Sequence, residues 1–166
     1  IQVAKLAGVE LDVLGGDRSQ FKRGFLFTFS RQIHFHGMVG GEQKNSLLNG
    51  SRGLIFPVRW HEPFGLAIIE SLYFGCPVFA TPYGAVPELV PAECGVLSAH
   101  ALELAHAVKT TNFDRRACHQ HAVQRFHADI MARNYLQVYQ RILDGETLHQ
   151  HQPFIQGDAR NLPWGD

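Results

Sequence analysis

The stretch that decides the fold lies near the middle of the chain and reads Glu62-Pro63-Phe64-Gly65-Leu66-Ala67-Ile68-Ile69-Glu70. An apolar run at 53–58 precedes it, and a second apolar run at 77–80 follows a stop of small residues. This order predicts a strand, a loop holding Glu62, a helix carrying Glu70 about two turns in, and another strand. Because a helix N-terminus offers free N–H groups and partial positive charge, the two carboxylates would face one phosphate- or polyol-bearing ligand. The alternative is a solvated surface pair.

The composition is that of an ordinary globular chain. Its 166 residues suffice for one domain with a real core, and hydrophobic residues make up 45%. Fifteen basic and 15 acidic residues cancel, which leaves no electrostatic case for a nucleic-acid partner. No apolar run approaches the length of a transmembrane segment, and no secretory signal opens the chain. The three cysteines, Cys76, Cys94 and Cys118, are unpatterned, which indicates reduced thiols in a cytoplasmic protein.

Strands and helices alternate along the first part of the chain. Strands are expected at 11–14, 33–36, 54–58, 78–80 and 95–97, and helices at 43–49, 65–74 and 85–90. This alternation predicts an α/β fold with a parallel sheet covered by helices on both faces. Residues 25–31 fit either a strand or a loop covering an edge.

The last part of the chain changes character. Helices are expected at 101–109, 115–126 and 129–143, and the apolar stripe from Ile130 to Leu143 predicts a core contact. Residues 145–166 are polar and punctuated by proline and glycine, which predicts a tail that packs over the surface or is partly disordered. At the other end, residues 1–7 have the spacing of a helix end closed by Gly8, so we expect a truncated start.

Other chemistries have weaker support. His34 and His36 lie on one face of an expected strand and can bind a metal, but no cysteine or carboxylate joins them at ligand-like spacing, so no metal site is predicted. A Gly-x-Ser-x-Gly hydrolase elbow and a Gly-x-Gly-x-x-Gly dinucleotide fingerprint are both absent from the sequence, and Gly15-Gly16 is only a weak hint of the latter. The tripeptide Pro82-Tyr83-Gly84 is either a plain turn or a glycine loop pressed against a ligand.

The order of the segments is more specific than any one of them. After the strand that ends in Gly15-Gly16 come Ile33-His34-Phe35-His36-Gly37, Gly53-Leu54-Ile55-Phe56-Pro57, the Glu62–Glu70 stretch, Gly75-Cys76-Pro77-Val78, Thr81-Pro82-Tyr83-Gly84 and Gly95-Val96-Leu97. This order resembles the C-terminal, donor-binding domain of retaining glycosyltransferases of the GT-B fold, the large family 4 of nucleotide-sugar-dependent enzymes. Its hallmark is an E-x7-E motif, which Glu62 and Glu70 match. The resemblance runs from residue 1 to about residue 143 and leaves 144–166 as a tail.

The resemblance implies a Rossmann-like half of a GT-B fold and a role for each matching residue. Glu62 would lie by the donor sugar near its reacting carbon, as the catalytic carboxylate. Glu70 would accept hydrogen bonds from the ribose hydroxyls, which suit a group that only accepts. The backbone of Ile33 would contact the base. The backbone N–H groups of Phe64, Gly65 and Leu66 would bind the sugar and the diphosphate. Tyr83 and Gly84 would lie in a loop that approaches the diphosphate.

The protein implied is half of an enzyme. It would be the donor-binding part of a retaining, metal-independent, hexosyltransferase-like enzyme that moves a sugar from a UDP- or GDP-linked donor to an acceptor hydroxyl, without a cofactor. Its partner would be a missing N-terminal acceptor-binding domain, through which any attachment to the inner membrane face would occur. The alternatives are a non-catalytic nucleotide-sugar or phosphate-binding module and a GT-B epimerase.

The chain departs from the family pattern in two places. The Arg and Lys that the family sets on the diphosphate belong to a segment upstream of this chain, and nothing in the sequence assigns that role to Lys44 or Arg59. Arg59-Trp60-His61 also replaces the usual small polar residues before the first glutamate. Trp60 either stacks on a sugar or base, or caps the core as a loop aromatic.

Overall fold

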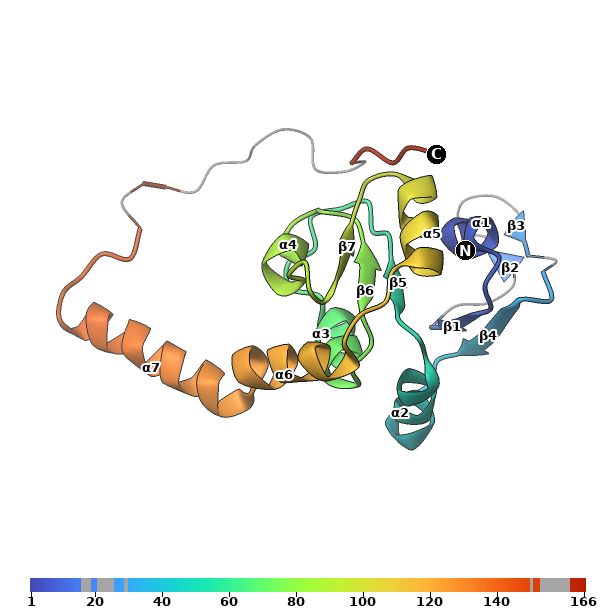
Figure 1. Ribbon diagram of the computed structural model, residues 1–166. Helices are drawn as coiled ribbons and strands as arrows, with labels where there is room; N and C mark the ends of the chain where they lie inside the picture. The colour runs from blue at the N-terminus through green and yellow to red at the C-terminus, as the bar shows by residue number, and fades with distance from the viewer. Residues whose placement is uncertain (16–18, 21–25, 29, 150, 153–161) are drawn as a thin grey trace.

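The computed structural model describes residues 1–15, 19–20, 26–28, 30–149, 151–152 and 162–166 (Figure 1). The strands are β1 (Leu11–Leu14), β2 (Ser19–Gln20), β3 (Leu26–Phe27), β4 (Ile33–Gly37), β5 (Leu54–Phe56), β6 (Val78–Ala80) and β7 (Gly95–Leu97). The helices are α1 (Gln2–Ala7), α2 (Gly41–Gly50), α3 (Leu66–Tyr73), α4 (Val86–Leu89), α5 (Ala101–Thr110), α6 (Arg115–Phe126) and α7 (Ala128–Leu143).

The strands form two parallel sheets and a short antiparallel pair. β1 pairs with β4, with Leu11 opposite Ile33. β6 lies between β5 and β7, so that Val78 faces both Leu54 and Gly95. β2 and β3 pair antiparallel, so the ambiguous segment at 25–31 contains a strand at Leu26–Phe27; Phe25 and Phe29 lie outside the described residues. The predicted α/β class, with parallel strands and a helical C-terminal end, is confirmed.

The central strand β6 is buried on both faces because helices cover it from both sides. Val78 and Ala80 pack against one layer, made by α3, α4 and α6. Phe79 points the other way, into a layer made by α1 and α5. This explains why 78–80 reads as a continuous apolar run rather than an alternating one.

Local chain chemistry sets several of the helix ends. α1 stops at Gly8, which takes φ 66° and returns its N–H to the Lys5 carbonyl, as the sequence predicts. α6 begins at Arg115 because the Asp114 side chain accepts the N–H of Arg116 at 2.8 Å. These two signals are readable in the sequence, and both bounds agree with the prediction.

The prediction that the stripe on α7 forms core is wrong. None of the residues of α7 is buried, and Leu136 is 65% exposed. α7 packs on α6 and extends away from the two sheets (Figure 1). Helical spacing reveals that one face is apolar, but it does not say what covers that face.

The end of the chain returns to the sheet. Gly165 forms a parallel bridge with His100, and the Ala101 N–H donates to the Gly165 carbonyl at 2.9 Å. Trp164 packs against the α1–α5 layer, and its Nε1 donates to the Gln2 side-chain oxygen at 2.9 Å. The tail therefore packs over the surface at residues 162–166; residues 153–161 lie outside the described part.

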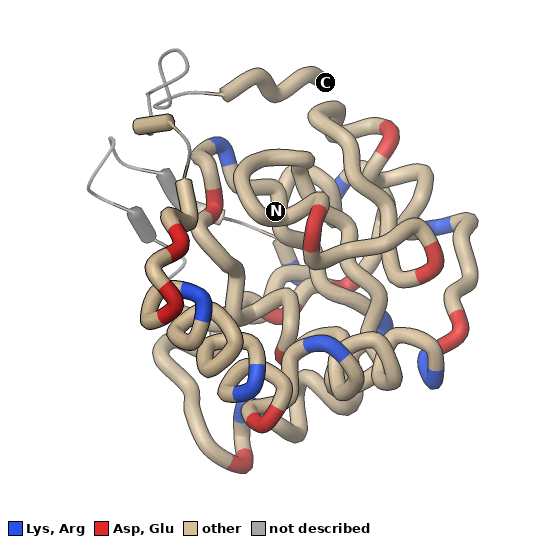
Figure 2. The backbone as a smooth tube through the Cα atoms, turned by 90° about the vertical axis from the view of Figure 1, so that its left-hand side faces the viewer, with Lys and Arg blue, Asp and Glu red and all other residues tan. Residues whose placement is uncertain are grey.

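Charges of both signs are interspersed around the molecule (Figure 2), in line with the formal net charge of zero. Within the ranges that the structure describes, none of the helices is both long and apolar enough to cross a membrane.

Candidate functional site

The loops after β5 and β6 lie against each other at the carboxyl ends of these strands. Glu62 and Gly84 form an isolated parallel bridge, and the Ala85 N–H donates to the Glu62 carbonyl at 2.8 Å. Gly84 takes φ +65°, and a Cβ placed there would lie 2.4 Å from the backbone N and O of Glu62. Only glycine permits this approach. Carboxyl ends of neighbouring parallel strands are where open α/β sheets bind ligands.

The Glu62 carboxylate is held by its neighbour in the loop. Trp60 Nε1 donates to Glu62 Oε2 at 3.1 Å. The Trp60 side chain is 52% exposed, so it does not cap the core. The sequence makes Trp60 a candidate for stacking on a sugar or base, but it does not predict this hydrogen bond.

The start of α3 is open. Gly65 precedes the helix at φ 90°, without a side-chain cap, and its carbonyl accepts the N–H of Ile68 at 2.9 Å. Leu66, the first residue of α3, is 71% exposed. The N–H groups of the first turn therefore remain suited to an anion or a sugar oxygen. Phe64 packs edge-on against Phe126 of α6, with ring centroids 6.1 Å apart.

Glu70 is the fifth residue of α3, a little over one turn from its start rather than two. Lys44 Nζ, on α2, lies 2.6 Å from Glu70 Oε1, and both side chains are partly exposed. The expected helix around Lys44 is present, but the sequence does not reveal that this face of α2 meets α3. Lys44 is thus a residue of the candidate site that sequence reasoning left without a role.

The end of the chain joins the two loops. The Tyr83 hydroxyl donates to the Pro163 carbonyl at 2.6 Å. Arg59 Nε donates to the Leu162 carbonyl at 3.2 Å, and the Leu162 N–H donates back to the Arg59 carbonyl at 3.3 Å. Arg59 therefore contacts the tail. These contacts span 80 or more positions in sequence, and no local pattern announces them.

Ile33 stands apart from the other predicted site residues. Its side chain is fully buried at the start of β4, opposite Leu11, whereas the others lie in α3 or in the loops after β5 and β6. Its contact with a base stays a prediction. At the other end of β4, Met38 follows Gly37 and is 91% exposed, and its sulfur lies 3.6 Å from the position of a Cβ on Gly15.

The histidines and cysteines have structural contacts. His36 Nε2 lies 2.7 Å from Asp12 Oδ1, so a carboxylate joins one histidine across neighbouring strands. Within the described residues, however, no three potential ligands gather around a common point. Burial raises the pKa of Cys76 and Cys94, and it raises the pKa of Cys118 to about 12. All three thiols are buried and uncharged at neutral pH, which suits packing rather than nucleophilic chemistry.

Comparison of the sequence with known proteins finds a matching family and a relative. The family described as "Glycosyl transferases group 1" matches residues 1–111, well over half of the chain. An uncharacterized 41.2 kDa protein in the cps region of Klebsiella pneumoniae is 26% identical over 115 residues, which are 64% of this chain and 32% of that protein.

Solved structures share the fold. AviGT4, a glycosyltransferase involved in avilamycin A biosynthesis, aligns with a TM-score of 0.69 at 22% identity over 87% of this chain and 46% of its own. Sucrose-phosphate synthase from Thermosynechococcus elongatus gives 0.65 at 22% identity, over 87% and 42%. Anabaena HepE in complex with UDP and glucose gives 0.58 at 21% identity, over 67% and 32%. The chain thus spans less than half the length of each of these proteins.

Proposed function

Because the chain belongs to the group 1 glycosyltransferases, we propose that residues 1–143 are the donor-binding half of a retaining enzyme that moves a sugar from a nucleoside diphosphate to an acceptor hydroxyl. One observation carries the proposal: the Glu62 loop and the Gly84 loop are joined at the head of α3, the helix that also bears Glu70. A carboxylate near a reacting carbon, free N–H groups for a diphosphate and a carboxylate for ribose would then serve one extended donor.

The uncapped start of α3 would hold the diphosphate. As the bond from the anomeric carbon to the phosphate oxygen breaks, negative charge grows on that oxygen, and the N–H groups of the first turn stabilise it without a metal ion. The acceptor oxygen forms the new bond to the same carbon, and its proton passes to the leaving diphosphate. Glu62 would lie beside the sugar, with Oε2 oriented by Trp60.

Glu70 would bind the ribose. Lys44 contacts Oε1, so Oε2 remains to accept from the ribose hydroxyls. Support for a nucleotide-sugar donor comes from HepE, whose structure holds UDP and glucose. Both UDP- and GDP-linked sugars fit the proposal. The acceptor would be bound by a separate N-terminal domain, and residues 144–166 would be a tail whose last residues brace the donor loops.

Calorimetry tests the proposal. Residues 1–166, as a folded chain, should bind UDP or GDP weakly and transfer no sugar, because the proposed acceptor would be bound by a separate domain. Glu70→Gln should weaken this binding. Glu93→Gln should not change it, because Glu93 lies on an exposed turn at the amino end of β7, whereas the candidate site lies at the carboxyl ends of the strands. A folded sample that binds neither nucleotide would remove the site assignment.

A further inference from the structure

Residues 162–166, called the strap below, run past the loops that hold the candidate site. Leu162 exchanges two hydrogen bonds with Arg59, in the loop after β5, at 3.2 and 3.3 Å. The carbonyl of Pro163 accepts a hydrogen bond from the Tyr83 hydroxyl, in the loop after β6, at 2.6 Å. β5 and β6 are neighbours in the sheet, so the strap connects the two loops that follow them.

The rest of the strap is fixed to a different part of the molecule. Trp164 packs into the apolar layer made by α1 and α5, and its Nε1 donates to the side-chain oxygen of Gln2 at 2.9 Å. Asp166 accepts from the Gln2 amide at 2.8 Å. Gly165 forms a bridge with His100, and a Cβ on Gly165 would lie 2.3 Å from the His100 ring. Trp164 is thus the large apolar anchor of the strap, on the α1–α5 layer rather than at the donor loops.

The loop after β5 has little packing of its own to fix its position. Of residues 59–64, all but Glu62 are exposed. Hydrogen bonds therefore determine where this loop lies. Its start is bonded to the strap, Trp60 donates to Glu62, and the Glu62 carbonyl accepts the N–H of Ala85 at 2.8 Å. Loops with few buried contacts open easily when such bonds are lost.

From these contacts we infer that Trp164 is a positioning residue of the donor site, an inference that rests on the function proposed above. Trp164 fixes the strap, and the strap holds Arg59 and Tyr83. Each of these two residues precedes a residue that contacts Glu62. A diphosphate that meets both loops binds less tightly when the strap is released, because part of the binding free energy then goes into ordering the loops.

Calorimetry with UDP and GDP on the complete enzyme tests this inference. Trp164→Ala removes the anchor, and the Kd of the nucleotide that the wild type binds should rise at least about fivefold, which is the effect of losing one hydrogen bond. Trp164→Phe keeps an aromatic ring in the layer and should largely restore the affinity. An unchanged Kd in Trp164→Ala would overturn the inference.

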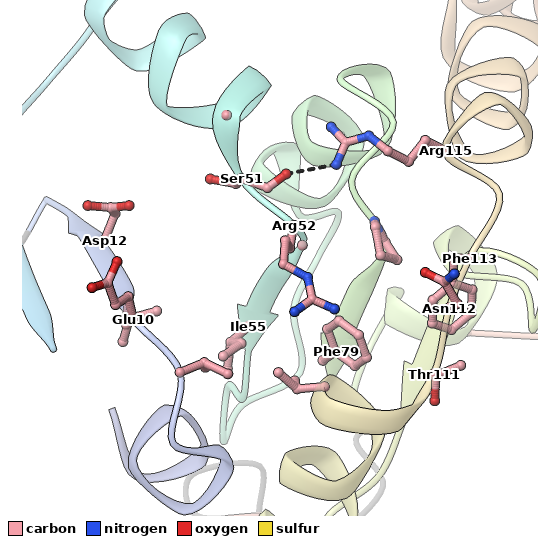
Figure 3. A pocket seen from close by; sticks show the side chains of 16 residues that line it. Glu10, Asp12, Ser51, Arg52, Ile55, Phe79, Thr111, Asn112, Phe113 and Arg115 are labelled. Carbon is pink, nitrogen blue, oxygen red and sulfur yellow. Dashed lines mark hydrogen bonds between the residues drawn. The ribbon is translucent and has the colours of Figure 1, made fainter.

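Val108→Ala is the matched control for lost packing. Val108 lies in the same apolar layer as Trp164, but at the other end of α5 from His100. It lines a separate cavity of about 610 Å³ between β1 and β5 (Figure 3), whose walls include neither Glu62 nor Tyr83. Val108→Ala should lower the free energy of unfolding in urea and leave the nucleotide Kd unchanged. An equal rise of Kd in both variants would mean that the layer as a whole, and not the strap, supports the site.

A double-mutant cycle shows whether Trp164 acts through the strap. Tyr83→Phe removes only the hydroxyl that donates to Pro163. This change should weaken nucleotide binding in the wild-type background and add nothing in the Trp164→Ala background, because the strap is already released there. Additive effects would mean that the two residues act independently, which would overturn the inference.

Residue-resolved hydrogen exchange without nucleotide measures the loops themselves. In Trp164→Ala, the amide of Ala85, which donates to the Glu62 carbonyl, should exchange at least about tenfold faster. The amide of Val78, which donates to the Cys94 carbonyl in the core, should not change. A rise of Kd without faster exchange at Ala85, or the reverse, would overturn the inference. If the wild-type enzyme binds neither UDP nor GDP, the proposed function itself fails, and this role fails with it.

Discussion

At the scale of single residues, both glutamates of the E-x7-E pair already have a partner. Trp60 donates to Glu62, and Lys44 lies against Glu70. Each carboxylate thereby has one oxygen oriented and one available. The sequence predicts the two carboxylates from their spacing, but it cannot predict Lys44, because that contact depends on how α2 packs against α3.

Exchange of each glutamate for glutamine should separate their roles in the complete enzyme. Hydrogen bonds to a charged group contribute roughly 1.5–3 kcal/mol, so Glu70→Gln should lower donor affinity roughly tenfold to a hundredfold. Glu62→Gln should lower kcat more than it raises the donor KM, because its interaction strengthens as charge develops. Steady-state kinetics with a melting curve on each variant measures both effects. Unchanged kinetics in both variants would place the pair outside the active site.

Alanine substitutions at Gly84 and Gly145 test whether the loops after β5 and β6 lie as close together as the structure shows. Both have positive φ, 65° and 85°, but a Cβ on Gly84 meets the Glu62 backbone at 2.4 Å, whereas one on Gly145 meets nothing within 4 Å. Gly145→Ala should cost about 1 kcal/mol from strain alone. Gly84→Ala should cost roughly 2–4 kcal/mol in urea unfolding. Equal losses in the two variants would mean that the loops do not meet in solution.

Cys118 should make the protein sensitive to alkaline pH. Its pKa rises to about 12 in the folded chain because burial disfavours the thiolate, whereas a cysteine in the unfolded chain has a pKa of about 8.5. Between these values the unfolded chain loses a proton that the folded chain keeps. The contribution to stability is therefore complete below about pH 8.5 and falls as pH rises toward 12, by roughly 2 kcal/mol at pH 10. Denaturant unfolding from about pH 7 to about pH 10.5 measures this loss, and Cys118→Ala should reduce its slope without removing it, because burial also raises the pKa of Cys76 and Cys94. An equal slope in the variant would refute the assignment.

At the scale of elements, helix and strand bounds follow closely from the sequence, because caps and apolar runs are local signals. The strands at 11–14, 78–80 and 95–97 and the helix at 115–126 agree with their predicted bounds. Whether the apolar face of a helix is buried is less predictable, because burial depends on residues that are distant in sequence. The α7 stripe reads as core and is exposed, whereas α3 buries Ile68 and Leu72 fully.

Two leucines compare these helices directly. Leu72→Ala on α3 removes a fully buried side chain and should cost about 2–5 kcal/mol. Leu136→Ala on α7 removes one that is 65% exposed and should cost less than about 0.5 kcal/mol. Chemical denaturation of both variants gives the comparison. A large loss for Leu136→Ala would show that the stripe is covered in solution.

At the scale of the whole molecule, three separate parts of the chain hold the loops of the candidate site together. The loop after β5, the loop after β6 and residues 162–166 meet at the carboxyl ends of the strands. A parallel sheet predicts the first two, because neighbouring strands end at one edge. The third could not be predicted, since Pro163 and Leu162 reach Tyr83 and Arg59 through contacts that have no counterpart in local sequence pattern.

The two tryptophans of the chain both lie at this edge, and the protein therefore carries its own optical reporter of the site. Trp60 donates a hydrogen bond to Glu62. Trp164 donates one to Gln2 and follows the residues that contact Tyr83 and Arg59. A nucleotide sugar that engages Glu62 should shift the emission of Trp60, and Trp60→Phe should abolish that shift while leaving the Trp164 emission in place. Titration by fluorescence, with no label attached, then follows occupancy of the site directly. An emission that stays constant while calorimetry records binding would locate the ligand elsewhere.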